Sequence, residues 1–293
     1  MMNLREAIPI ESLIAADIGS AYTHLCLIDR VEGAFRFVAQ AETPTTLGGA
    51  EHDLLLGVRR ALRRLEQVAQ RPLLDAREAL ILPEEYTGAG IDAFVATCSA
   101  APPLRGALIG LTEDLSVQSA LRACAGADVM ILQTLALGAR PRREQVRALA
   151  ALRSLRLDLI LMVGGLDAGH TSLLESAAAV IATAYAQAPR AERPVILFAG
   201  NQEARRPIAD HVRPALDYRV VENVRPSLGA ETPQELLREL ALLYTERKLA
   251  ALPGYEQLTR WCTAPVRTPP RRWPPPGATS ASDTLCMRYW AWM

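Results

Sequence analysis

The sequence has almost no lysine. Lys248 is the only lysine among 293 residues, although lysine and arginine together number 32. A P-loop nucleotide site needs a lysine directly after a glycine on a strand-to-helix loop, whereas Lys248 follows Arg247 inside an expected helix. The sequence therefore excludes a P-loop nucleotide site.

A surplus of charge of one sign is also missing. The 32 Lys and Arg residues equal the 32 Asp and Glu residues, so the formal net charge is zero. Long-range attraction to nucleic acid or to an anionic membrane is then weak, and we expect neither as a partner. No run approaches the roughly 18 apolar residues of a membrane span, and the first residues lack the layout of a secretory signal. We therefore expect a cytoplasmic protein.

Cysteine and histidine are few and show no ligand spacing. The five cysteines are scattered, and no CxxC pair occurs. The four histidines form no H-E-x-x-H motif, and no serine lies in G-x-S-x-G. These absences argue against a zinc site, a disulfide framework and a hydrolase nucleophile.

Apolar patterning predicts an antiparallel meander at the start of the chain. Residues 13–16 are wholly apolar, and residues 22–28 and 35–41 alternate between apolar and polar side chains, which is typical of strands. Only Gly19-Ser20 need lie between the first two strands. A Gly-X pair is typical of a type II′ hairpin turn, so we expect the chain to reverse there.

A helix follows this meander. Residues 51–68 carry apolar side chains at helical spacing, with arginines on the other positions. Three meandering strands followed by a covering helix predict a ribonuclease-H-like unit, which we place at residues 1–91.

From about residue 92, short apolar strands alternate with helices. This alternation predicts a mainly parallel sheet covered on both faces, over residues 92–255. The predicted strands cover residues 94–97, 106–109, 129–133, 157–163, 195–198 and 218–221, and the predicted helices cover residues 116–124, 143–154, 172–186, 204–212 and 233–252. The expected fold class is therefore α/β. Residues 256–293, which are rich in proline and tryptophan, are expected to be an irregular tail.

The first turn carries residue types that hold phosphate. Tight turns present backbone N–H groups, glycine allows close approach, and hydroxyl groups add donors. The turn and its flanks supply these types in Asp17, Gly19, Ser20, Tyr22 and Thr23. Asp17 is placed to hold a magnesium ion through water. A plain hairpin with a hydrated carboxylate fits the same spacing, and the spacing alone leaves this alternative open.

A second glycine-rich loop follows the predicted strand 157–163. It contains Gly164, Gly165, Asp167 and Gly169 and leads into a helix. Such loops bind anions because backbone amides and the helix dipole converge there. A tight turn whose glycines serve geometry alone is the alternative. In a parallel sheet, the loop with Asn201 would lie on the same edge, where Asn201 would also cap the next helix.

These motifs resemble those of a known family. "AADIGSAYTHLCLID", residues 15–29, resembles the first phosphate motif of the actin, sugar-kinase and Hsp70-like ATPases. The chain is also similar to MutL-type proteins associated with glutamate mutase and ornithine aminomutase. This similarity extends, in consistent order, over the later segments "LDLILMVGGLDAGHTSLLESAAAVI", "PVILFAGN" and "VVENVRPSLG". These MutL-type proteins are unrelated to the mismatch-repair protein of the same name. The resemblance covers residues 13 to about 270.

The resemblance implies an ATP-dependent reactivating or chaperone factor for an adenosylcobalamin-dependent aminomutase. ATP and Mg²⁺ would be its cofactors and a mutase subunit its partner. In the family's manner, Asp17 would serve the metal while Gly19, Ser20, Tyr22 and Thr23 hold phosphate. The alternative is a non-catalytic binding or scaffolding module of a mutase complex.

The chain departs from the family pattern in ways that leave ATPase activity open. Ala21 stands where the family usually has threonine, and His24 stands where it often has lysine. Family members continue beyond the position of residue 270 into a second ATPase half with its own phosphate motif. Residues 271–293 do not resemble that half, so we expect this chain to lack it.

Overall fold

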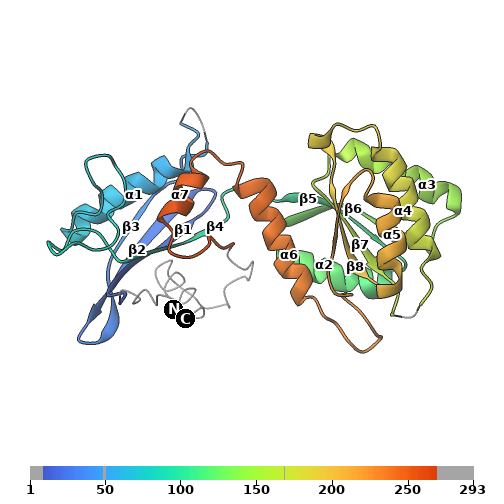
Figure 1. Ribbon diagram of the computed structural model, residues 1–293, viewed down its shortest axis with the longest axis horizontal. Coiled ribbons are helices and arrows are strands. Elements are labelled where there is room, and N and C mark those ends of the chain that lie inside the picture. Colours follow the sequence, from blue (N-terminus) through green and yellow to red (C-terminus); the bar gives the residue numbers. More distant parts are fainter. Residues whose placement is uncertain (1–8, 49–50, 168, 269–293) are drawn as a thin grey trace, which may run out of the picture. The chain divides into compact units, whose positions relative to one another are not determined.

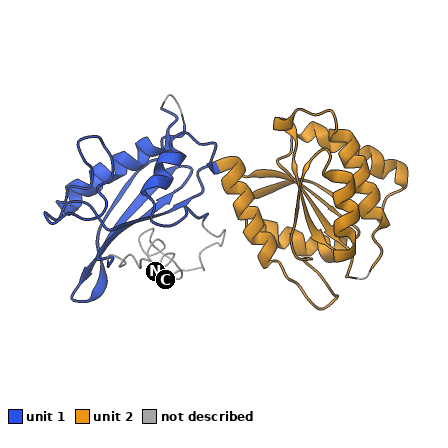
Figure 2. Ribbon diagram, viewed as in Figure 1, with its two compact units in different colours: residues 1–101, 249–293 blue, residues 102–248 orange. Residues whose placement is uncertain are grey.

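The computed structural model describes residues 9–48, 51–167 and 169–268. The chain forms two compact units, which Figure 2 colours separately. Unit 1 comprises residues 1–101 and 249–293, and unit 2 comprises residues 102–248. The expected boundaries, after residues 91 and 255, differ from this division. Each unit is described by itself below.

Unit 1 is built on a four-stranded sheet. Its strands are β1 (Ser12–Ile18), β2 (Tyr22–Val31), β3 (Ala34–Pro44) and β4 (Ala93–Cys98). They lie in the order β3-β2-β1-β4, with β1, β2 and β3 antiparallel and β4 parallel to β1. The predicted meander is thus confirmed. Pairing of β4 with β1 is the reason why the first boundary lies beyond residue 91.

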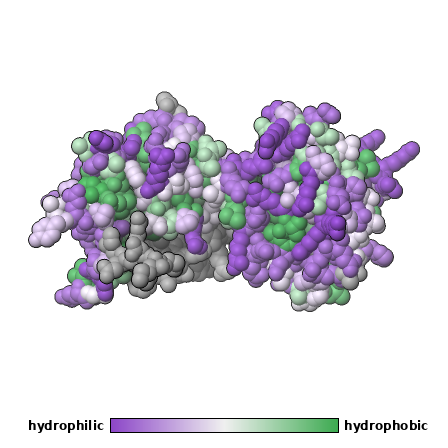
Figure 3. Space-filling view, viewed as in Figure 1, coloured by the Kyte–Doolittle hydropathy of each residue, from purple (hydrophilic) through white to green (hydrophobic). Residues whose placement is uncertain are grey.

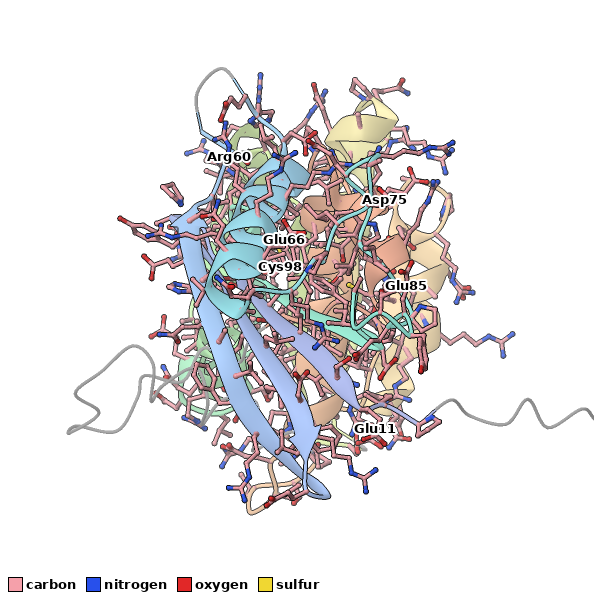
Figure 4. The ribbon with its side chains drawn as sticks, turned by 90° about the vertical axis from the view of Figure 1, so that its left-hand side faces the viewer. Glu11, Arg60, Glu66, Asp75, Glu85 and Cys98 are labelled. Carbon is pink, nitrogen blue, oxygen red and sulfur yellow. The ribbon has the colours of Figure 1, made fainter. Side chains whose placement is uncertain are left out.

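Helix α1 (Leu54–Ala69) covers one face of this sheet. Figure 4 shows α1, which carries Arg60 and Glu66, lying across the strands. The helix begins later than predicted because the Asp53 side chain caps it, accepting a hydrogen bond from the Leu55 N–H at 2.8 Å. The Thr43 hydroxyl of β3 donates to the Gly57 carbonyl of α1. This bond identifies the helix-covered face, because alternate residues of a strand share a face.

The chain returns to unit 1 beside β4. Helix α7 (Tyr255–Trp261) places the Trp261 ring edge-on to Phe94, with ring centroids 6.4 Å apart. Beyond it, Thr97 forms a parallel bridge with Arg267. The Arg267 N–H donates to Ala96 O at 3.1 Å, and the Cys98 N–H donates to Arg267 O at 2.8 Å. Unit 2 is therefore inserted between β4 and a short segment that bridges to β4 at the edge of the sheet.

The expectation of an irregular tail over residues 256–293 is wrong for its first part. Residues 255–261 are helical, and Arg267 pairs with β4. Proline and tryptophan content did not indicate this because the pairing partner is distant in sequence. Residues 269–293 lie outside the described residues.

Unit 2 contains a five-stranded parallel sheet. Its strands are β5 (Leu104–Gly110), β6 (Val129–Ala136), β7 (Leu159–Gly164), β8 (Val195–Gly200) and β9 (Asp217–Val220). Their order is β6-β5-β7-β8-β9, and every neighbouring pair is parallel. The predicted parallel sheet is confirmed, except that the predicted strand 94–97 is β4 of the other sheet. In order of appearance this is the 2-1-3-4-5 arrangement of doubly wound α/β domains.

Helices cover both faces of this sheet. They are α2 (Gln118–Ala125), α3 (Arg142–Ala151), α4 (Ser172–Tyr185), α5 (Arg205–Val212) and α6 (Gln234–Tyr244). Figure 1 shows α3, α4 and α5 on one face and α2 and α6 on the other. Strands β7 and β8 are completely buried between these layers. Their unbroken apolar sequence follows from burial on both sides.

One carboxylate joins the two ends of unit 2. Asp158 Oδ2 accepts a hydrogen bond from the Arg105 N–H at 2.8 Å and lies 2.7 Å from Lys248 Nζ. Arg105 belongs to the first strand of the unit, and Lys248 is its last residue. The Asp158 side chain is 23% exposed and the Lys248 side chain 17%, so solvent screens this ion pair less than it screens a pair on the surface.

Four cysteines lie within the described part of the chain. Cys26, Cys98, Cys124 and Cys262 form no disulfide. Burial raises the pKa of Cys124 and of Cys262 to about 12, so both are protonated thiols at neutral pH. Over the described ranges, no three His, Cys, Asp or Glu side chains are grouped to hold a metal ion.

No helix in the described part of the chain combines the length and apolar character needed to cross a bilayer. The expected cytoplasmic location stays a prediction.

We predict that Asp158→Asn lowers the free energy of unfolding of unit 2 by about 1 to 3 kcal/mol, because the partly buried Lys248 ammonium loses its counter-charge. Hydrogen exchange of unit 2 amides, followed by mass spectrometry in increasing urea, measures this. Glu192→Gln, which neutralises an exposed acid of the same unit, should change it by less than about 0.5 kcal/mol. Equal effects of the two substitutions would refute a special role for Asp158.

Candidate functional site

The first turn of unit 1 reverses one residue later than predicted. The Gly19 N–H donates to Tyr22 O at 2.9 Å, which leaves Ser20 and Ala21 at the tip. Gly19 therefore continues the strand ladder, and its φ is not positive. The expected type II′ turn at Gly19-Ser20 is thus wrong. Glycine still suits this position, because an added Cβ would lie 3.1 Å from Tyr22 O.

The tip of this turn offers two backbone donors. Ser20 and Ala21 lie outside the strands and are exposed. Their N–H groups donate to no acceptor among the described residues. Two adjacent unsatisfied N–H groups at an exposed turn are suited to bind an anion.

Threonine hydroxyls support the turn from beneath. Thr45 Oγ1 donates to Gly19 O at 2.9 Å, and the Thr45 N–H donates to Ala21 O at 2.8 Å. The Thr23 hydroxyl is buried, 3.0 Å from Thr45 Oγ1. Thr23 therefore holds the turn in place from below. Thr45 was not identified from the sequence, since its role depends on the fold of β3 back onto the turn.

Asp17 lies on the sheet face opposite α1, in a row of polar side chains. The row crosses neighbouring strands in register and comprises Glu42, His24, Asp17, Thr97 and Arg267. The Thr97 hydroxyl donates to Asp17 Oδ1 at 2.8 Å, and His24 Nδ1 lies 3.1 Å from Glu42 Oε2. Asp17 is partly exposed, so its carboxylate could hold a hydrated divalent cation.

The glycine-rich loop of unit 2 closes on itself. Gly164 and Gly165 have φ values of 117° and 74°, which favour glycine. The Asp167 carboxylate accepts hydrogen bonds from Asn223 Nδ2 at 3.1 Å and from the Gln202 N–H at 3.2 Å. Asn223 Nδ2 also donates to Gly165 O at 3.0 Å. The Asp167 carboxylate thus already binds donors from the segments that follow β8 and β9.

The loops after β7 and β8 meet at one edge of the sheet, as expected for parallel strands. Gly164 pairs with Gly200, and Asn201 Nδ2 donates to Gly169 O at 2.9 Å. Asn201 Oδ1 accepts from the Glu203 N–H at 2.9 Å, which confirms the predicted cap. Asn223 was missed, although it follows the short strand β9 and therefore lies at the same edge.

These observations define a class of protein. Unit 1 has a ribonuclease-H-like strand order, and unit 2 is a doubly wound α/β domain inserted into it. A family model described as MutL protein matches residues 13–272. The chain belongs to this MutL family, which is associated with glutamate mutase and is distinct from mismatch-repair MutL.

A curated relative matches this chain over only part of the relative's own length. Protein MutL from Clostridium tetanomorphum is 25% identical over 248 residues, which are 83% of this chain and 46% of the relative. The chain thus spans less than half of that curated relative.

Two solved structures that resemble the chain are also larger proteins. Nucleotide-free acetone carboxylase has a TM-score of 0.43 and 16% identity, covering 88% of this chain and 36% of the other. Nucleotide-free diol dehydratase-reactivating factor has a TM-score of 0.20 and 12% identity, covering 72% of this chain and 30% of the other.

We predict that Asn223→Ala lowers the free energy of unfolding of unit 2 by about 1 to 3 kcal/mol, because Gly165 O and Asp167 both lose a buried donor. The exposed Gln187 of the same unit is the matched control, and Gln187→Ala should cost less than about 0.5 kcal/mol. Urea unfolding followed by far-ultraviolet circular dichroism measures both. A cost for Asn223→Ala as small as that of the control would contradict this account of the loop.

Proposed function

We propose that the turn at Ser20-Ala21 binds the phosphates of ATP, and that the chain is part of an ATP-dependent reactivating factor for an adenosylcobalamin-dependent aminomutase. The observation that carries the proposal is the pair of unsatisfied N–H groups at the tip of the turn, beside the partly exposed Asp17. Membership of the glutamate mutase-associated MutL family supports the choice of a mutase as partner.

Each residue of the turn has its own role in this proposal. Asp17 holds Mg²⁺ through water, with its carboxylate oriented by the Thr97 hydroxyl. Gly19 lets the backbone close tightly, and Ser20 adds a hydroxyl donor at the exposed tip. Thr23 fixes the turn through Thr45, so that the donors need little reorganisation when phosphate binds.

The loop of unit 2 receives a different role. Gly164, Gly165, Asp167 and Gly169 were expected to bind a cofactor, but the Asp167 carboxylate already accepts hydrogen bonds from the Gln202 N–H and from Asn223 Nδ2 beside this loop. We therefore assign the phosphates to the turn of unit 1. What we propose for this chain is nucleotide binding.

A non-catalytic scaffolding module is the second candidate function. Two observations favour it. The Thr23 hydroxyl is engaged by Thr45, and the glycine-rich loop of unit 2 is closed by its own hydrogen bonds. A chain with this function would contact a mutase subunit without binding nucleotide.

We predict saturable binding of Mg-ATP and Mg-ADP by the 293-residue chain in calorimetric titration. Asp17→Asn should weaken Mg-nucleotide binding by about tenfold or more, because a neutral amide binds hydrated Mg²⁺ poorly. The same titration without Mg²⁺ should show little difference between the variant and the wild-type chain.

Glu32→Gln is the matched control, since Glu32 is an exposed acid in the same meander, between β2 and β3. It should leave nucleotide affinity unchanged. Thermal melting of each variant shows whether it is folded. Absence of binding by the folded wild-type chain up to millimolar nucleotide would contradict the first proposal and favour the scaffold.

A further inference from the structure

Arginine is concentrated on and around helix α3. Six arginines fall within residues 140–156, and all are exposed: Arg140, Arg142, Arg143, Arg147, Arg153 and Arg156. The only acid in this segment is Glu144. None of the six arginines forms an ion pair within the part of the chain that the structure describes. Figure 3 shows hydrophilic side chains projecting from the surface where α3 lies.

Helix α3 is unusual in how little it buries. Leu149 is the one fully buried side chain of its ten residues. Helices of globular proteins normally bury a broad apolar stripe. Because α3 is held by so few side chains, most of its surface is available for other contacts.

A groove of about 460 Å³ lies between α3 and α4, lined by apolar and polar side chains alike, and Arg142 is the one of the six arginines that lines it. Val146 and Leu149 line it from α3, and Leu173 and Val180 line it from α4. Val146 is 43% exposed and Leu173 is 41% exposed, so apolar surface is open to solvent. Polar groups at the groove include Arg142, Ser172, Glu175, Ser176 and His211, and Glu175 accepts a hydrogen bond from the Thr171 hydroxyl.

We propose that this groove binds an acidic amphipathic helix of a partner protein. The apolar face of such a helix would cover Val146 and Leu173, and its carboxylates would meet Arg142 in the groove and the exposed Arg143 next to it. The proposal goes beyond the nucleotide proposal, because it uses unit 2 alone and none of the residues of the turn in unit 1.

The same observations disfavour other anionic partners. Nucleic-acid backbones are met by basic surfaces, whereas this groove has exposed valine and leucine side chains and the carboxylate of Glu175. A helix that lies on a membrane carries bulky apolar side chains along one face. Helix α3 has only Val146 and Leu149 of that kind among its ten residues.

The test uses the full 293-residue chain and a fluorescein-labelled 18-residue helical peptide. The peptide carries leucine on one face and glutamate on the other, and fluorescence anisotropy measures its binding. A second peptide has lysine in place of every glutamate. A duplex oligonucleotide serves as a purely anionic probe. We expect saturable binding of the acidic peptide, with at least about tenfold weaker binding of the other two probes.

Substitutions separate the charge from the apolar contact. Arg142→Glu with Arg143→Glu should weaken binding of the acidic peptide by about tenfold, because Arg142 lines the groove and Arg143 is exposed next to it. Val146→Asp, or the milder Val146→Ser, should weaken it by a similar factor because the apolar contact is lost. Arg238→Glu with Arg247→Glu changes the net charge equally at exposed positions on and just after α6, and should alter affinity by less than about twofold.

The outcomes decide the proposal. Loss of affinity in both groove variants, with the α6 control unaffected and all variants folded by circular dichroism, supports it. It is overturned if the acidic peptide does not bind at millimolar concentration, or if the duplex binds as tightly. It is also overturned if both Val146 variants keep full affinity, because attraction would then be to charge alone.

Discussion

The fold depends on holding the two ends of unit 2 together, and the Asp158 carboxylate does this. The chain leaves unit 1 after β4 and returns to pair beside β4, so the inserted unit must begin and end close together. Asp158 meets this constraint by binding a backbone N–H of the first strand and the side chain of Lys248. Lys248 is the only lysine of an arginine-rich chain, so the compact ammonium charge of a lysine occurs at this one position.

The two glycine-containing loops differ in whether their carboxylate is bound by nearby hydrogen-bond donors. Both gather backbone donors near a carboxylate. In unit 2, Asp167 turns back into its loop and is bound by Asn223 and Gln202. In unit 1, the carboxylate of Asp17 is held on a strand by Thr97, and the donors at the tip of the turn remain exposed. A loop whose donors are already satisfied gains little from a ligand, whereas an exposed, rigid turn loses little entropy on binding one.

Much of the fold could be predicted from periodicity, since the strands of both sheets and the helices between them follow apolar patterns in the sequence. The predictions that were wrong concern features that depend on pairing between residues distant in sequence. The turn moved by one residue because Gly19 pairs with Tyr22, and β4 belongs to unit 1 because it pairs with β1. Thr45 and Asn223 have no local signature, because each acts on a loop that lies far away in sequence.

The insertion also has a consequence for synthesis on the ribosome. The Thr263 N–H donates to Phe94 O, and the Thr263 hydroxyl bonds the same carbonyl, 169 positions away in the sequence. Strand β4 therefore emerges long before its last partner, and all of unit 2 is translated in between. Domains generally fold as units during translation, and closing a loop costs entropy that grows with its length. Once unit 2 has folded with its ends joined, the final pairing in unit 1 requires closure across short connections only.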